Sequence, residues 1–221
     1  MKIAVLTSGG KDSILALHRI AKFGDITLVT AIPRERESFM FHTVNLHMVE
    51  EVADCLNLPL RKFEVSGVKE KEVEELEKGM ASLEIDAICC GAIASNYQLR
   101  RVEKICRSLG VELLAPLWGE EPERILEEVA KSFNAIIVSV SAMGLDESFL
   151  GRRIDEFCVE DLKRIAKRAR INLAGEGGEY ETLVLDAPLY RKRIIVREFE
   201  KSWEKVRGVA IVRKFEKIEK S

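Results

Sequence analysis

Paired cysteines, histidines and long apolar runs are scarce in this sequence, and each scarcity excludes a class of protein. The 221 residues include five cysteines and three histidines. The cysteines have neither the CxxC spacing of a zinc site nor the spacing of a disulfide framework. No apolar run reaches the roughly 18 residues of a membrane span, and polar residues interrupt the first apolar segment too early for a signal peptide. We therefore expect a cytoplasmic protein with reduced, mostly buried thiols.

A strong excess of charge of one sign is also missing. The formal net charge is −2 at pH 7, so no global basic field would recruit nucleic acid, although a local basic patch stays open. Charged residues make up 33% of the chain and glutamine occurs once, a balance that resembles thermophile proteins. Apolar residues make up 47%, which is enough for a real core in one large domain or two modest ones.

The first half of the chain alternates strand-like and helix-like segments. Such alternation predicts a parallel sheet with right-handed crossovers. Ligands bind beyond the carboxyl ends of strands in sheets of this kind. Stretches 8–13, 31–36 and 91–98 should therefore share one rim. The expected strands are 2–6, 26–32, 60–65, 85–93 and 111–117, and the helical patterns between them begin near 14, 44, 73 and 96.

The regular alternation of strand-like and helix-like segments ends after residue 118. A helix beginning at Pro122 is followed by a strand-like run, a polar stretch at 142–155 and a second helical pattern. Three short strand-like runs complete the chain. We therefore predict two domains, one at 1–118 and a smaller α+β domain at 119–221. The expected elements of the second half are helices at 122–133 and 159–170 and strands at 135–141, 183–186, 192–197 and 208–215.

The stretch Ser8-Gly9-Gly10-Lys11-Asp12-Ser13 joins the first strand to the first helix. Its glycines permit positive φ and a close approach of a ligand, and its amides, hydroxyls and lysine attract anions. An aspartate beside a phosphate makes most sense with Mg²⁺, which takes oxygen ligands and phosphates together. The alternative is an ordinary turn, with Ser8 as the helix N-cap and Asp12 complementing the helix dipole.

This stretch resembles the SGGxDS loop of the N-type ATP pyrophosphatases, the PP-loop superfamily. The resemblance implies an adenine nucleotide alpha-hydrolase-like (Rossmann-like) fold, with a five-stranded parallel sheet and helices on both faces. It also implies cleavage of ATP between its α and β phosphates, so that a carbonyl or carboxylate oxygen of the substrate becomes adenylated. A nitrogen or sulfur nucleophile would then displace AMP.

Two longer motifs resemble the diphthine–ammonia ligase family, over about residues 1 to 190. One runs from Gly91 to Glu103 and the other is Gly175-Glu176-Gly177-Gly178-Glu179-Tyr180-Glu181-Thr182. The resemblance implies a short archaeal-type member that amidates the carboxylate of diphthine on translation elongation factor two. ATP and Mg²⁺ would be required, and AMP and pyrophosphate would be released. Free ammonium is the expected nitrogen source, because no glutaminase domain is present.

Diphthine also carries a quaternary ammonium group, which aromatic faces bind. Tyr180, flanked by carboxylates, is therefore a candidate receptor, and the same loop could help to deprotonate ammonium. The catalytic candidates are Lys11, Asp12, Glu176 and Glu179, with Asp12 also the metal ligand. The candidate nucleotide ligands are Ser8, Gly9, Gly10, Lys11, Asp12, Ser13, Ala31, Ile32, His42 and Gly91. The candidate substrate ligands are Ser95, Tyr97, Gln98, Arg100, Gly177, Gly178, Tyr180 and Glu181.

Several alternatives remain open at this stage. Ile32 could pack in the core, and Arg100 could belong to a surface helix with Glu103 and Arg107. The chain could act on another carboxylate or on a tRNA base, although the acidic 175–182 motif argues against RNA. It could also bind a nucleotide without cleaving it. We leave a homodimer open.

Overall fold

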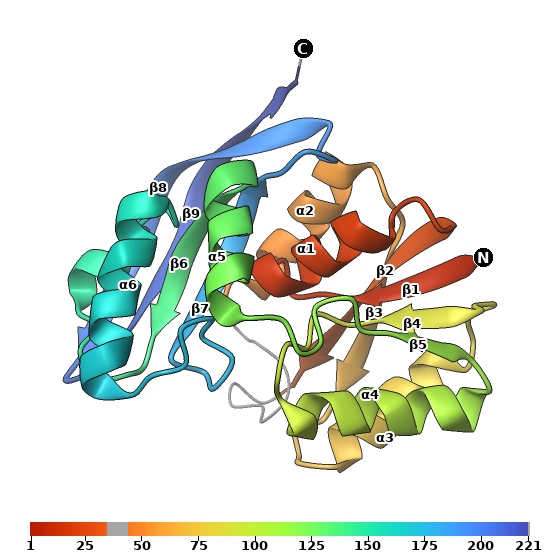
Figure 1. Cartoon of the computed structure of the whole chain (residues 1–221). Coiled ribbons are helices and arrows are strands. Elements are labelled where there is room, and N and C mark those ends of the chain that lie inside the picture. The colour runs from red at the N-terminus through yellow and green to blue at the C-terminus, as the bar shows by residue number, and fades with distance from the viewer. Residues whose placement is uncertain (35–43, 221) are drawn as a thin grey trace.

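A parallel sheet forms the N-terminal half of the protein (Figure 1). The structure is a computed structural model that describes residues 1–34 and 44–220. The five strands of this sheet follow the order β3-β2-β1-β4-β5, and every pairing is parallel. This confirms the fold class expected from the alternation of strands and helices. The strands are β1 (Lys2–Leu6), β2 (Asp25–Pro33), β3 (Leu60–Val65), β4 (Ala87–Cys89) and β5 (Glu112–Leu114).

Helices cover both faces of this sheet, because alternate residues of each strand point to opposite sides. Ile3 and Val5 pack in a cluster with α1 (Lys11–Ile20) and α2 (Val49–Leu56). Ala4, between them, packs in a second cluster with the other two helices. Each large apolar side chain buried in this way contributes about 1.5–3 kcal/mol. The helices of the second cluster are α3 (Lys71–Met80) and α4 (Asn96–Leu109).

A four-stranded antiparallel sheet forms the C-terminal half, with the order β7-β6-β9-β8. Together with its two helices it confirms the smaller α+β unit, although the boundary at 118/119 stays a prediction. None of the described helices is long and apolar enough to cross a membrane. The elements are α5 (Pro122–Ser132), β6 (Asn134–Val140), the 3-10 helix η2 (Glu147–Phe149), α6 (Glu156–Ala169), β7 (Tyr180–Asp186), β8 (Lys192–Glu204) and β9 (Arg207–Glu219).

The two halves share one hydrophobic core. Helices α1 and α2 lie between the sheets (Figure 1), and the cluster that contains them continues into β6 and β7. Backbone contacts strengthen the junction: the amide of Val184 donates to the carbonyl of Gly9 at 2.9 Å. The amide of Arg191 donates to the carbonyl of Cys55 at 2.6 Å. The second sheet therefore packs directly against the loop that follows β1.

Several expected elements have different bounds in the structure. The expected strand 85–93 is paired only over Ala87–Cys89, because the chain then turns close to α1. A Cβ on Gly91 would lie 2.6 Å from the carbonyl carbon of Asp12. The expected strand 111–117 is likewise paired only over Glu112–Leu114, and the amide of Trp118 closes a turn on the carbonyl of Ala115.

Two expected helices also differ in where they begin. The helix expected from residue 44 begins as the 3-10 helix η1 (Leu46–Met48), because Asn45 has φ +59° and starts it from a left-handed conformation. Helix α6 begins at Glu156 rather than 159, because the Asp155 carboxylate accepts a hydrogen bond from the amide of Cys158 at 2.8 Å. A capping side chain of this kind supplies a partner for an otherwise unpaired first-turn amide.

Candidate functional site

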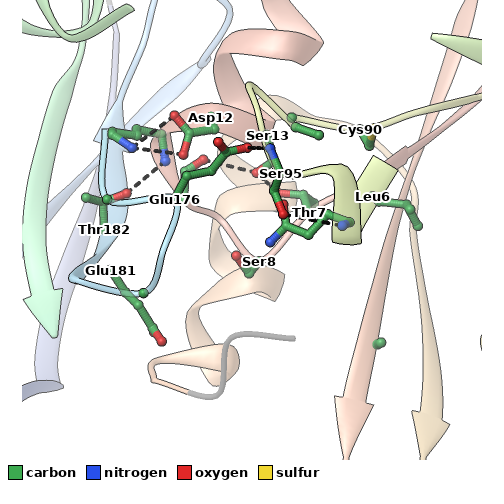
Figure 2. A pocket seen from close by; sticks show the side chains of 18 of the residues that line it. Leu6, Thr7, Ser8, Asp12, Ser13, Cys90, Ser95, Glu176, Glu181 and Thr182 are labelled. Carbon is green, nitrogen blue, oxygen red and sulfur yellow. Dashed lines mark hydrogen bonds and ion pairs between the residues drawn. The ribbon is translucent and has the colours of Figure 1, made fainter. Parts of the chain in front are cut away.

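A pocket of about 390 Å³ opens at the carboxyl ends of the parallel strands, with the loop before β7 forming its opposite wall (Figure 2). It brings together the stretches near 8–13, 31 and 91–98, as the rim argument predicts, and the 175–182 motif joins them. The predicted residues that line it are Ser8, Gly10, Lys11, Asp12, Ser13, Ala31, Gly91, Ser95, Tyr97, Gln98, Glu176, Gly177, Gly178, Tyr180 and Glu181.

Other predicted residues lie elsewhere. Gly9, Ile32, Arg100 and Glu179 are not in the wall of this pocket, and His42 lies outside the described residues. Arg100 is exposed on α4, where Glu103 and Arg107 form the ion pair expected of a surface helix, at 2.6 Å. The residues that line the pocket without having been predicted are Leu6, Thr7, Val29, Thr30, Leu46, Cys90, Ala92, Val102, Gly175 and Thr182.

The loop after β1 is shaped by one glycine and two hydroxyl groups. Gly9 has φ +80°, a conformation that favours glycine, and its amide donates to Oγ1 of Thr7 at 2.9 Å. The same oxygen lies 2.7 Å from Oγ of Ser13. The N-cap of α1 is Gly10, with φ −77° and no capping side chain. Ser8 therefore does not cap this helix, as the alternative of an ordinary turn would require, and of the two glycines that permit a positive φ only Gly9 adopts one.

The ammonium group of Lys11 lies at the junction between the two halves. Its Nζ contacts both carboxylate oxygens of Asp12, at 2.9 and 2.8 Å, and the carbonyl of Ala174 at 2.5 Å. The Lys11 side chain is only 3% exposed. Three acceptors match the three protons of an ammonium group. Lys11 thus orients the Asp12 carboxylate and ties the N-terminal loop to the segment before the second motif.

Glu176 reaches across the pocket to the segment that follows β4 (Figure 2). Its Oε1 accepts hydrogen bonds from the amides of Ile93, Ala94 and Ser95 at 2.7, 3.0 and 3.1 Å. Its Oε2 accepts from Ala94 at 2.8 Å. Ser95 Oγ in turn accepts from the amide of Gln98 and caps α4. The Glu176 carboxylate therefore holds the start of α4 against the second half of the molecule.

The other members of the 175–182 motif are divided between packing and the pocket. Tyr180 is 2% exposed, and its hydroxyl donates to the carbonyl of Leu173 at 2.8 Å. The cation over its ring, at 5.4 Å, is the Nζ of Lys11, so this ring does not offer the open aromatic face expected for a ligand cation. Glu179 Oε1 accepts from the amide of Asn172 at 2.7 Å. Among the carboxylates of this motif, Glu176 and Glu181 line the pocket.

The thiols are free and buried, as the composition predicts. Burial raises the pKa of Cys89 to about 12 and also raises the pKa of Cys90, whose side chain lines the pocket. Both thiols are thus neutral at physiological pH, and a neutral thiol is a poor nucleophile. A thiol-carrier mechanism gains no support from this geometry.

The residues present fit Mg²⁺ only together with phosphate oxygens. Within residues 1–34 and 44–220, no group of three or more His, Cys, Asp or Glu side chains is arranged to hold a metal ion. Mg²⁺ commonly binds through one or two carboxylates, substrate phosphates and water. Asp12 lines the pocket beside the glycine loop and can supply one such carboxylate.

Fold and loop together define an α/β protein of the PP-loop class. The diphthamide synthase N-terminal domain matches residues 1–113 and the diphthamide synthase C-terminal domain matches residues 121–218. The chain belongs to the diphthamide synthase family and is an enzyme of the ligase class.

Curated relatives named diphthine–ammonia ligase support the same assignment. The relatives from Bos taurus and Homo sapiens are each 34% identical over 90% of this chain and 84% of their own length. The relative from Schizosaccharomyces pombe is also 34% identical over 90% of this chain, but the chain spans only 37% of its length. A solved predicted subunit of tRNA methyltransferase from Methanocaldococcus jannaschii aligns with a TM-score of 0.46 at 16% identity, over 85% of this chain and 98% of that chain. That likeness is too distant to inform function.

Proposed function

We propose that the chain is an ATP-dependent diphthine–ammonia ligase that amidates the diphthine carboxylate on translation elongation factor two. The observation that carries the proposal is one pocket walled by both motifs, the glycine loop after β1 and the 175–182 motif. Family membership supports the same substrate, and it does not favour the alternatives of a tRNA-directed ligase or a non-catalytic nucleotide-binding protein. The products are diphthamide, AMP and pyrophosphate.

In this proposal the β and γ phosphates of ATP lie on the segment from Ser8 to Ser13. The amides of Gly9 and Lys11 already donate to the hydroxyls of Thr7 and Thr182. The other amides and the hydroxyls of this segment are suited to anions. Asp12, oriented by Lys11, would hold Mg²⁺ together with the phosphates. Mg²⁺ would supply charge neutralisation for the leaving pyrophosphate. The chain itself contributes mainly positioning and preorganised dipoles.

The proposed chemistry has two displacements. The diphthine carboxylate attacks the α phosphorus, and the bond to the β-phosphate oxygen breaks to release pyrophosphate. Ammonia then attacks the acyl carbon, loses a proton, and AMP departs with the electrons of the acyl–oxygen bond. Glu176 acts here as a positioning residue rather than a base, because three backbone amides already occupy its carboxylate. Glu181 also lines the pocket, and it is the carboxylate that we propose for binding ammonium.

The test combines the purified chain with ATP, Mg²⁺, ammonium and diphthine-bearing elongation factor two. We expect AMP and pyrophosphate in equal amounts, and mass spectrometry should show the carboxyl hydroxyl replaced by an amino group. Asp12→Asn should lower AMP formation by about 100-fold or more, because it removes a charge at the reacting phosphates. Asp54→Asn is the matched control, since Asp54 pairs with Lys192 and Lys217 outside the pocket. Formation of ADP would contradict the proposal.

A further inference from the structure

Tyr97 carries a buried hydroxyl that has no hydrogen-bond partner among the described residues. A buried polar group without a partner destabilises the folded state, because its hydrogen bonds with water are lost on folding and not replaced. The other two tyrosines of the chain are paired: Tyr180 donates to the carbonyl of Leu173 and Tyr190 to that of Val184, at 2.8 and 3.2 Å. Tyr97 is therefore the one tyrosine of the three whose hydroxyl has no hydrogen-bond partner in the described part of the chain, and its side chain lines the pocket.

The Tyr97 ring is held firmly in place. The guanidinium carbon of Arg101 lies 3.2 Å from the ring centroid, and Lys69 Nζ lies 5.6 Å from it. Arg101 also donates from Nη1 to the carbonyl of Tyr97 at 2.9 Å and forms an ion pair with Glu70. A ring stacked on a guanidinium that is itself held by a hydrogen bond and an ion pair loses little further freedom when a ligand binds. The position of the hydroxyl is thus set before binding.

The surroundings of Tyr97 indicate which part of a nucleotide it would meet. Its helix, α4, packs on the face of the sheet opposite to α1, through Val102 and its neighbours. The apolar residues that pack in the same cluster as α4 and also line the pocket include Leu6, Val29, Ala31 and Ala92. An apolar surface suits a flat base and sugar, whereas the phosphates need the donors of the glycine loop. Tyr97 therefore belongs to the nucleoside end of the pocket.

We propose that the Tyr97 hydroxyl hydrogen-bonds the nucleoside half of ATP and so contributes to nucleotide affinity and selectivity. This inference rests on the proposed function only in taking ATP as the ligand. It differs from the sequence-based expectation that Tyr97 binds the second substrate. It also accounts for the buried hydroxyl, since a bound nucleotide supplies the missing hydrogen-bond partner.

The experiment measures binding of ATP and of AMP by calorimetry, without the protein substrate. Tyr97→Phe removes only the hydroxyl and should weaken binding of both nucleotides by about 5- to 10-fold, the worth of one hydrogen bond. Its unliganded thermal stability should stay equal or rise, because an unpaired polar atom is lost. Tyr190→Phe is the matched control: it should lower thermal stability and leave nucleotide affinity unchanged.

The outcomes separate the inference from the proposed function. If the unaltered chain binds neither nucleotide, the proposed function fails. If it binds both and Tyr97→Phe binds them equally well, the inference fails, because the hydroxyl then contributes nothing to nucleotide binding. A loss confined to ATP would place the contact on the outer phosphates and overturn the assignment to the nucleoside. A steady-state assay of Tyr97→Phe with diphthine-bearing elongation factor two completes the test. A rise in the KM for that protein with unchanged nucleotide affinity would assign Tyr97 to the second substrate and overturn the inference as well.

Discussion

Asn45 joins the N-terminal half to strand β9, and its replacement tests how much this contact between the halves contributes to stability. Asn45 is buried, with 3% of its surface exposed. Its Nδ2 donates to the carbonyl of Ala210 and its Oδ1 accepts from the amide of Val212, both at 2.9 Å. Asn45 also has φ +59°. Because the next residue, Leu46, lines the pocket, this contact also positions part of the site.

The magnitude follows from these two features. Asn45→Ala leaves two buried backbone groups without partners, which costs about 2–4 kcal/mol in total. Alanine in the left-handed conformation adds about 1 kcal/mol. The free energy of unfolding should therefore fall by roughly 3–5 kcal/mol. At about 2–4 °C per kcal/mol for a chain of this size, the melting temperature should fall by about 10 °C.

Asn57 provides the matched control. It has φ +54°, forms the C-cap of α2 and is exposed. Asn57→Ala should therefore show only the conformational cost, about 1 kcal/mol. Asn45→Gly relieves the positive φ and should still lose most of the stability. Urea unfolding followed by circular dichroism measures all three. Equal losses for Asn45→Ala and Asn57→Ala would refute the reasoning, because the hydrogen bonds to β9 would then contribute nothing.

Two further predictions concern Glu176 and His18. Glu176→Gln should speed hydrogen exchange at the amides of residues 93–95, because an uncharged amide binds three N–H donors less well. Glu179→Gln is the control. Unchanged exchange in Glu176→Gln would show that the carboxylate does not hold the start of α4. Burial lowers the pKa of His18, so the unfolded chain binds its proton first. Stability should therefore fall as pH drops below about 6.5, and His18→Gln should flatten that dependence in pH-dependent thermal melts.

The strands and helices around the parallel sheet and the glycine loop can be predicted from the sequence, because each is a continuous segment with a local pattern. Strand and helix periodicities are readable within about ten residues, and β3 and α5 begin where the pattern places them. The site rim follows from topology alone, since parallel strands end on one edge. The short pairing of β4 could not be read in this way, because it depends on the approach of Gly91 to the backbone of Asp12 and Ser13.

The amino-acid sequence is thus sufficient for the strands and helices of the layered fold, the glycine loop after β1 and the two family motifs, each of which is a continuous segment. The roles inside the pocket depend on contacts between distant segments. Lys11 bonds to Ala174, 163 residues away, and Glu176 bonds to amides that precede it by 81 to 83 residues. Which side chains face a ligand and which serve the junction is decided by how the second sheet packs on the first. No local pattern contains that information, because these hydrogen bonds form only after the two halves share a core.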